Sequence, residues 1–185
     1  MGEPLKEHPS ERRQALIEAA FGFIAQRGFE GLRLRDVAAA AGIDHSTLHH
    51  HFATKQDLID AVVGYAVAQF RTVSDASAPP HEQLRLHLAG LSRMMGDRPD
   101  LFVVMRELDL RATRDAAVRT IIARHEEGWR LALVRRLEGV AADLDRQACV
   151  ELIIAAVKGV SLRPASASSV LSQLERLIAG GGTSA

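Results

Sequence analysis

The sequence is poor in the residues and patterns that mark secreted and membrane proteins. It contains a single cysteine, Cys149, so no internal disulfide can form and a disulfide-stabilised secreted fold is not indicated. No apolar run approaches the roughly 18 to 20 residues that span a bilayer, and residues 1–10 lack the apolar segment of a signal peptide. We therefore expect a cytoplasmic protein with no membrane partner.

Aromatic residues are also scarce, at 4% of the chain, and no segment alternates apolar and polar residues with the period of two typical of a half-buried strand. Hydrophobic residues reach 47% and charged residues 25%, so the 185 residues can form a packed core and are not expected to be disordered. Because Ala, Leu and Arg dominate, the composition predicts an all-α protein.

The chain has no excess charge of either sign, since 23 Lys and Arg balance 23 Asp and Glu. Residues 1–65 carry seven Lys and Arg against nine Asp and Glu, a formal charge of −2 before histidines. Bulk charge therefore does not favour nucleic-acid binding, which depends on cations near phosphates. Any DNA affinity of this segment must come from the local placement of basic side chains, helix N-termini and histidines.

Periodicity and capping signals predict a succession of helices. Gly28 suits the left-handed stop that ends a helix, Gly42 and Ile43 predict a tight turn, and Pro164 ends a helix because it lacks an N–H. The N-caps that we expect are Ser10, Asp44, Thr54 (in a capping box with Asp57), Thr113, Asp145 and either Ser166 or Ser168. Apolar spacings of three and four predict helices at residues 10–27, 34–41, 45–52, 55–74, 84–95, 100–110, 113–140, 145–162 and 166–178. Residues 75–80 are linker-like and form the best internal boundary.

The most informative segment is residues 33–55, where two short helices flank the turn at Gly42. Leu48 and Phe52 are four residues apart and are expected to face the core, which leaves the other face of the second short helix free. That face is polar and suits hydrogen bonding in the DNA major groove, as a recognition helix requires. We expect Arg33, Arg35 and the helix start at Thr54 and Lys55 to hold phosphates. The predicted DNA-binding residues are Arg33, Arg35, His45, Ser46, Thr47, His49, His50, Thr54 and Lys55.

Residues 12–63 resemble the N-terminal domain of the TetR family of repressors. The resemblance rests on Ala19-Ala20, Gly28-Phe29, Leu34-Arg35-Asp36-Val37-Ala38, Ala41-Gly42-Ile43, Thr47-Leu48, His51-Phe52, Lys55 and Leu58. It covers under a third of the chain, and the later helices match only in number and order. Arg33 and His49 depart from the family, which usually has Thr and Tyr at positions that tend to touch the DNA backbone.

Helical periodicity predicts a connecting helix at residues 55–74, and the glycine-rich end predicts a flexible tail at 181–185. The resemblance implies a helix-turn-helix head at residues 10–54 and a helical effector-binding and dimerisation domain at 80–180. It implies a homodimer whose two recognition helices enter successive major grooves of operator DNA, about 34 to 36 Å apart. A small, mostly apolar effector would favour a head spacing that no longer fits and so release the operator.

The later helices offer candidates for the effector and dimer sites. A pocket could be lined by Leu91, Met94, Met95, Phe102, Met105, His125 and Trp129, although ordinary core packing explains each of them as well. A ridge of small residues on the helix at 145–162 predicts close helix packing, either within the subunit or across a two-fold axis. The resemblance implies that this ridge and the last helix form a four-helix dimer interface. Its predicted residues are Ala148, Leu152, Ala155, Ala156, Gly159, Val170, Leu174 and Leu177.

The sequence leaves three alternatives to a regulator: a metal site, an enzyme and a binding protein. His45 and His49 have a metal-ligand spacing but lack a third ligand, so we expect no metal and no cofactor. The sequence lacks a phosphate-binding glycine loop, an HExxH pair and a nucleophile elbow, so we do not expect an enzyme. The remaining alternative is a helical binding or adaptor protein with a vestigial head, which would show no salt-dependent affinity for DNA.

Overall fold

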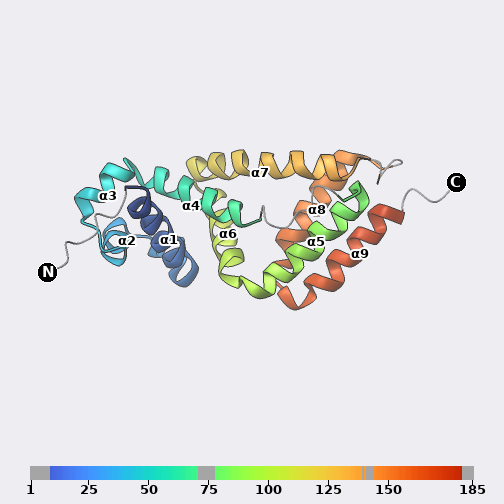
Figure 1. Cartoon of the computed structure of the whole chain (residues 1–185), viewed down its shortest axis with the longest axis horizontal. Helices are drawn as coiled ribbons and strands as arrows, with labels where there is room; N and C mark the ends of the chain where they lie inside the picture. The colour runs from blue at the N-terminus through green and yellow to red at the C-terminus, as the bar shows by residue number, and fades with distance from the viewer. Residues whose placement is uncertain (1–8, 71–77, 139, 141–143, 181–185) are drawn as a thin grey trace. The chain divides into compact units, whose positions relative to one another are not determined.

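The computed structural model describes residues 9–70, 78–138, 140 and 144–180 (Figure 1). These residues are helical, with no strand among them, as the composition predicts. The elements are α1 (Pro9–Arg27), η1 (Phe29–Gly31), α2 (Leu34–Ala40), α3 (His45–His51), α4 (Lys55–Gln69), α5 (Pro80–Asp97), α6 (Pro99–Ala112), α7 (Ala116–Arg136), α8 (Arg146–Val160), η3 (Pro164–Ser166) and α9 (Ala167–Gly180).

The described residues form two compact units. Unit 1 comprises Met1–Ala66 and Val103–Ile122, and unit 2 comprises Val67–Phe102 and Ala123–Ala185. Helices α4, α6 and α7 each contribute residues to both units. The units therefore do not coincide with the division at residues 75–80 that the sequence suggests, and the functional domain boundaries stay a prediction.

Unit 1 is built around the apolar faces of its short helices. Leu16, Ala20 and Ile24 form the buried stripe of α1, and Val37, Leu48 and Leu58 bring α2, α3 and α4 into the same core. The turn between α2 and α3 is a Schellman motif, since the N–H of Ile43 donates to the carbonyl of Ala38 and that of Gly42 to Ala39. Gly42 has a φ of 67°, which a glycine adopts without strain.

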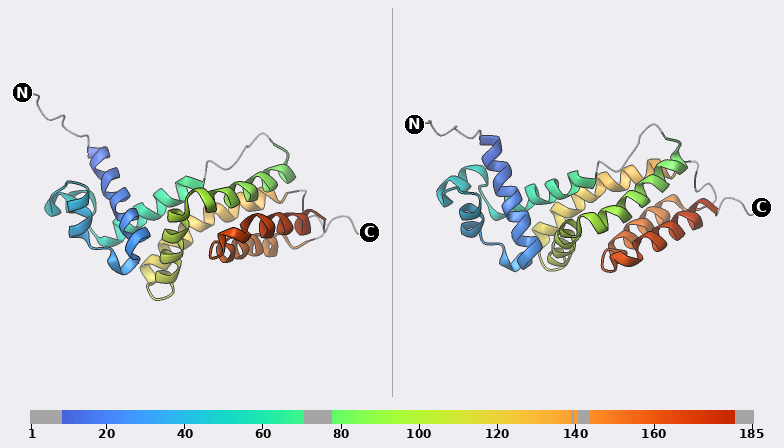
Figure 2. Two further views of the ribbon diagram at one scale, coloured as in Figure 1. Left: turned by 90° about the horizontal axis from the view of Figure 1, so that it is seen from below. Right: turned by 60° about the horizontal axis from the view of Figure 1, so that its bottom comes forward.

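Unit 2 contains α5, α8 and α9. Helix α9 packs beside both α5 and α8, as Figure 2 shows. The buried side chains recur every three or four residues along each helix, as in Leu84, Leu88 and Leu91 of α5. Asp145 caps α8 as predicted, because its Oδ1 accepts from the N–H groups of Gln147 and Ala148 at 2.9 and 3.2 Å.

The helix boundaries agree with the predicted ones to within a few residues, and three caps differ. The predicted cap Ser10 lies inside α1, which already includes Pro9. The predicted cap Thr113 only donates its hydroxyl to the carbonyl of Leu110, whereas Asp115 accepts from the N–H groups of Ala117 and Val118 and so caps α7. Asp44 occupies the N-cap position of α3 without a side-chain capping bond. The predicted extension of the fourth helix over residues 71–74 lies outside the described residues.

Candidate nucleic-acid interface

Helix α3 presents a polar face on the surface of unit 1. His45, Ser46, His49 and His50 are exposed, and Thr47 is partly buried. The opposite face is anchored by Leu48 and by Phe52 directly after the helix, which are 0% and 1% exposed. The guanidinium of Arg13 lies 4.8 Å from the centroid of the Phe52 ring and covers it further. A short helix held in this way keeps its outer side chains available for hydrogen bonds in a groove.

The two histidines on α3 with metal-ligand spacing contact each other. The rings of His45 and His49 are edge-to-face with centroids 4.8 Å apart. No group of three or more His, Cys, Asp or Glu side chains that could hold a metal ion occurs among the described residues. The pair therefore lacks a third ligand in the part of the chain that the structure describes.

The start of α4 carries the predicted capping box. The Thr54 N–H donates to Asp57 Oδ2 at 2.8 Å, and the Asp57 N–H donates to Thr54 Oγ1 at 3.1 Å. Thr54 is exposed, but Lys55 is partly buried and its Nζ lies 5.1 Å from the centroid of the Phe29 ring. The Lys55 ammonium thus has a cation–π contact within unit 1 in addition to any phosphate that it could reach.

Both predicted arginines beside α2 are exposed. Arg33 is the N-cap residue of α2 and has an extended backbone, and its carbonyl accepts from the N–H groups of Asp36 and Val37. Arg35 follows one residue inside the helix. The candidate DNA-binding residues therefore share one unit, and all of them except Thr47 and Lys55 are exposed.

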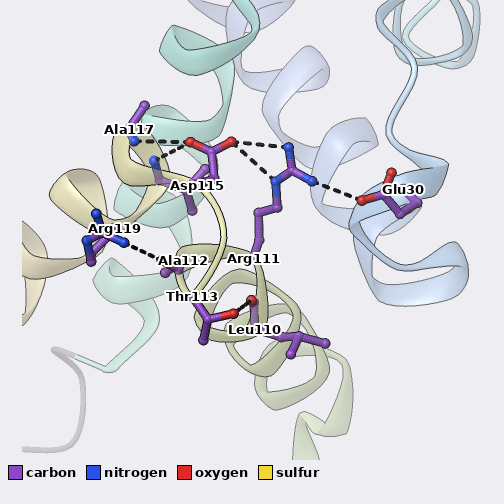
Figure 3. Close-up of polar contacts among 9 residues, drawn as sticks. Glu30, Leu110, Arg111, Ala112, Thr113, Asp115, Ala117 and Arg119 are labelled. Carbon is purple, nitrogen blue, oxygen red and sulfur yellow. Dashed lines mark hydrogen bonds and ion pairs between the residues drawn. The ribbon is translucent and has the colours of Figure 1, made fainter.

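A polar cluster that the sequence did not predict joins α6 to the segment between α1 and α2. Glu107 Oε2 accepts the backbone N–H of Phe29 at 2.9 Å. Arg111 donates from Nη1 to Glu30 Oε1 at 3.0 Å, and from Nε and Nη2 to Asp115 Oδ2 at 3.2 Å each (Figure 3). The guanidinium of Arg111 also lies 4.9 Å from the centroid of the Phe29 ring.

This cluster fixes the turn that precedes α2. Local periodicity gave no signal for it, since Phe29 and Glu107 are 78 residues apart. Backbone hydrogen bonds from Val118 and Ala117 and the Arg111 guanidinium lower the pKa of Asp115, with the bond from Val118 as the largest cause. The Arg111 contact to Glu30 is an exposed ion pair and contributes at most about 1 kcal/mol.

The predicted effector-pocket residues are divided between the two units. Leu91, Met95 and Phe102 are buried, and Phe102 packs edge-to-face on Phe70 with centroids 5.6 Å apart. Met94, His125 and Trp129 are partly exposed members of unit 2, whereas Met105 belongs to unit 1. Six of the seven predicted residues therefore belong to unit 2, and the pocket stays a prediction.

Trp129 is paired with a histidine that is not among the predicted pocket residues. Its Nε1–H donates to Nε2 of His87 at 3.1 Å, and His87 is only 4% exposed. Burial, with a smaller contribution from the positive charge of Arg136, lowers the pKa of His87 to about 4. A signal was available, because His87 interrupts the apolar stripe of Leu84, Leu88 and Leu91 at helical spacing.

The predicted dimer residues lie on α8 and α9. Most are exposed, including Leu152, Val170 and Leu177, and Ala156 is partly buried. Leu174 is 7% exposed and packs inside unit 2. The neighbouring Leu162 adds a further exposed apolar side chain after α8. These two adjacent helices therefore carry large apolar side chains that the single chain does not cover.

An ion-pair network fastens α7 to α8 within unit 2. Arg130 Nε donates to Glu151 Oε1 at 2.8 Å, and Glu126 accepts from both Arg130 and Lys158. The hydrogen bond from Arg130 lowers the pKa of Glu151, and the same bond raises the pKa of Arg130. Nearby Cys149 is buried, and burial raises the pKa of its thiol, which keeps it protonated and poorly nucleophilic.

None of the described helices combines the length and apolar character needed to cross a membrane.

Comparisons of sequence with known proteins agree with the geometry of α2 and α3. A family model described as bacterial regulatory proteins, tetR family, matches residues 16–62. The chain is 29% identical over 170 residues to the HTH-type transcriptional regulator CymR of Pseudomonas putida, over 85% of this chain and 81% of CymR. It is 35% identical over 80 residues to the HTH-type transcriptional repressor KstR2 of Mycobacterium tuberculosis, over 41% of this chain and 40% of KstR2.

Solved structures extend the similarity to the later helices. A Rhodococcus sp. protein described as a TetR-family transcriptional regulator superposes with a TM-score of 0.78 at 28% identity, over 91% of this chain and 97% of its own. The multidrug binding protein EbrR, solved in complex with imidazole, superposes with a TM-score of 0.65 at 28% identity, over 88% and 94%. Together with the exposed polar helix that follows the Gly42 turn, these similarities identify residues 16–62 as a DNA-binding domain of the TetR type. The chain as a whole is similar in sequence and fold to DNA-binding transcriptional regulators of the TetR family.

Proposed function

We propose that the chain is a cytoplasmic homodimeric repressor that a small, mostly apolar effector releases from its operator. The observation that carries the DNA-binding part is the polar outer face of α3, held outward by Leu48 and Phe52. Repression is supported by the similarity to the KstR2 repressors. No cofactor and no catalytic step belong to this proposal.

In the proposed complex, each α3 enters a major groove and its exposed side chains read base edges. Ser46, His49 and His50 can each donate or accept one hydrogen bond there. Arg33 and Arg35 hold phosphates beside α2, and the N-terminus of α4 with Thr54 and Lys55 holds another. These few cations near the phosphates would offset the net charge of −2 that residues 1–65 carry.

The proposed dimer forms through α8 and α9. Leu152, Val170 and Leu177 expose apolar surface on two helices that pack together, which suits a four-helix interface around a two-fold axis. Such an axis relates two recognition helices, and we expect a palindromic operator with half-sites about 34 to 36 Å apart.

The effector is proposed to bind in unit 2. Support comes from the aromatic and methionine side chains of α5, α6 and α7 and from EbrR, a similar protein that binds drugs. Effector binding can release DNA only if the effector has unequal affinity for the DNA-bound and free conformations. Helices α4, α6 and α7 contribute residues to both units. We therefore expect these helices to link effector binding in unit 2 to DNA binding by unit 1.

The test begins with selection of operator sites from random DNA duplexes and measures affinity against salt concentration. Arg35→Ala is expected to weaken operator binding and to reduce the slope of log Kd against log salt by about one. Arg85→Ala is the control, because it also removes an exposed cation, but from α5, far along the chain from the recognition helix. Its slope should equal that of the wild type.

Two results would count against the proposal. Absence of salt-dependent DNA binding in the wild-type protein would favour the adaptor alternative over the regulator. Equal slopes for Arg35→Ala and wild type would remove Arg35 from the phosphate contacts. The selected sites provide a separate check, since sites without two-fold symmetry would contradict the dimeric arrangement.

A further inference from the structure

His87 is a polar residue at a position where α5 is otherwise apolar. Leu84, Leu88 and Leu91 precede and follow it on the buried face, and all three are at most 1% exposed. The imidazole itself is 4% exposed. A leucine at this position would be buried without any hydrogen-bonding requirement, so a histidine here breaks a local rule of core composition. Such departures from local consistency concentrate at functional sites.

The protonation state of His87 follows from its surroundings. A pKa of about 4 leaves the imidazole neutral near pH 7, so it carries one proton on one of its two nitrogens. Nε2 accepts the indole N–H of Trp129 at 3.1 Å and therefore has no proton of its own. The proton is on Nδ1, which makes that nitrogen a hydrogen-bond donor.

This donor has no acceptor among the described residues. Nδ1 of His87 is buried and is not hydrogen-bonded within the part of the chain that the structure describes. A buried donor without an acceptor costs about 1 to 3 kcal/mol, and such atoms are rare in native proteins. The acceptor must therefore come from outside these residues.

We propose that His87 Nδ1–H donates to an acceptor oxygen of the bound effector, which is an apolar molecule carrying one carbonyl or carboxylate group. This inference rests on the proposed function, since it assigns the effector's polar group to a site in unit 2. His87 lies among the buried leucines of α5, so a molecule that reaches Nδ1 must itself be largely apolar. An amine offers only donors when protonated and cannot satisfy Nδ1–H.

The charge near His87 supports an electron-rich acceptor. The positive charge of Arg136, two helical turns beyond Trp129 on α7, acts on His87 and lowers its pKa. The same charge favours an oxygen with negative character over a cationic group in this part of unit 2. Trp129 is one hydrogen bond away from the proposed contact and is the only tryptophan of the chain, so its fluorescence reports on this site alone.

The test titrates three apolar scaffolds, octyl, cyclohexyl and adamantyl, each bearing a carboxylate, a methyl ketone, an ammonium or only a methyl group. Binding is followed by the fluorescence of Trp129. Wild type is expected to bind at least one carboxylate or ketone more tightly than the methyl and ammonium forms of the same scaffold. His87→Leu should weaken binding of that compound about tenfold or more and leave the methyl form unchanged.

Two further variants separate the donor from the packing. His87→Asn keeps an N–H near the position of Nδ1 and should restore part of the lost affinity. Arg93→Leu is the matched control, because it places a leucine at an exposed position of the same helix, α5, and it should bind like wild type. Circular dichroism shows whether each variant is folded.

Three outcomes would overturn the inference: equal loss of affinity for acceptor and methyl forms in His87→Leu, no loss in that variant, or no preference for acceptors in wild type. The proposed function is tested separately by displacement of selected operator DNA. A compound that releases the operator equally from wild type and His87→Leu contradicts the His87 contact and leaves effector release intact. A compound that binds through His87 without releasing DNA supports the His87 contact and contradicts effector release.

Discussion

Gly28 and Gly42 both have a φ near +70°, but their surroundings differ. A β-carbon on Gly28 would lie 2.9 Å from Oε2 of Glu107, the oxygen that accepts the N–H of Phe29. A β-carbon on Gly42 would meet nothing within 4 Å. A substitution at Gly42 therefore measures only the free-energy cost of a left-handed backbone. The same substitution at Gly28 adds the cost of displacing Glu107.

Alanine at either glycine is expected to destabilise the protein. Gly42→Ala should cost about 1 to 2 kcal/mol, the penalty of a left-handed conformation for a residue with a β-carbon. Gly28→Ala should cost about 1 kcal/mol more, because the Glu107 hydrogen bond to Phe29 must weaken or break. Urea unfolding followed by circular dichroism measures both variants.

A double-mutant cycle with Glu107→Ala tests the cause of the difference. In that background the carboxylate is absent, so Gly28→Ala and Gly42→Ala should have equal effects. An additional cost of Gly28→Ala that survives the removal of Glu107 would mean that another contact is responsible.

At the scale of elements, the turn between α6 and α7 depends on Asp115. One carboxylate oxygen caps α7 through the N–H groups of Ala117 and Val118, and the other receives Arg111, which also reaches Glu30 in η1. Figure 3 shows the side chain of Arg111 between the two acidic residues. Asp115 thus caps α7 and also positions the Arg111 guanidinium, which contacts Glu30 in η1.

Asp115→Asn should make the stability of the protein less dependent on pH. The pKa of Asp115 is held below its ordinary value of 3.8, so its stabilising effect is complete above that value and is lost as the pH falls through the lower, folded-state pKa. Asn keeps an oxygen for the cap but carries no charge for Arg111. The variant should therefore melt below wild type at pH 7, and the difference should shrink below pH 3.8.

Thermal melts across the acid range check this prediction. Asp97→Asn is the control, because Asp97 is an exposed aspartate at the end of α5. A difference between Asp115→Asn and wild type that is constant with pH would show that the charge of Asp115 is irrelevant and only the shape of the cap matters.

At the scale of the whole molecule, the proposed repressor requires two copies of the chain. The apolar side chains that are exposed on α8 and α9 form the proposed dimer interface. Among them, Leu177 is 63% exposed and Leu152 is 53% exposed. Their burial between two copies would remove apolar area from water, which is the main driving force of such association.

Leu177→Glu is expected to shift the protein toward monomer, since the dimer would bury an unpaired carboxylate. The dimer dissociation constant should rise at least about tenfold, equivalent to about 1.4 kcal/mol. Sedimentation velocity over a concentration series measures it. Leu110→Glu, at a similarly exposed leucine of α6, should leave the constant unchanged. The assignment of α8 and α9 is wrong if Leu110→Glu dissociates the dimer and Leu177→Glu does not.

The positions of the helices followed from local features. Leu16, Ala20 and Ile24 repeat with helical spacing and are buried, and Gly28 and Gly42 end helices where left-handed residues are needed. The capping box at Thr54 formed as predicted. The cap at Thr113 did not, because the helix begins later and Asp115 offers an acceptor closer to its first turn.

The candidate sites were predictable to different degrees. The polar face of α3 could be anticipated, since Leu48 and Phe52 determine by their spacing which side of a short helix is buried. The partner of Trp129 could not be anticipated in this way. His125 lies one turn from Trp129 on the same helix, and for that reason it was predicted to share a pocket with Trp129. His87 instead contacts Trp129 from α5, 42 residues earlier in the chain.

By itself, the sequence determined which residues are helical, where the helices end and which face of α3 meets water, because these depend on spacings of a few residues. Only the tertiary structure decided that Glu107 binds the backbone of Phe29 and that His87 keeps a donor without an acceptor among the described residues. Those features depend on which helices pack together, and hydrophobic periodicity identifies a buried face without identifying the neighbour that covers it.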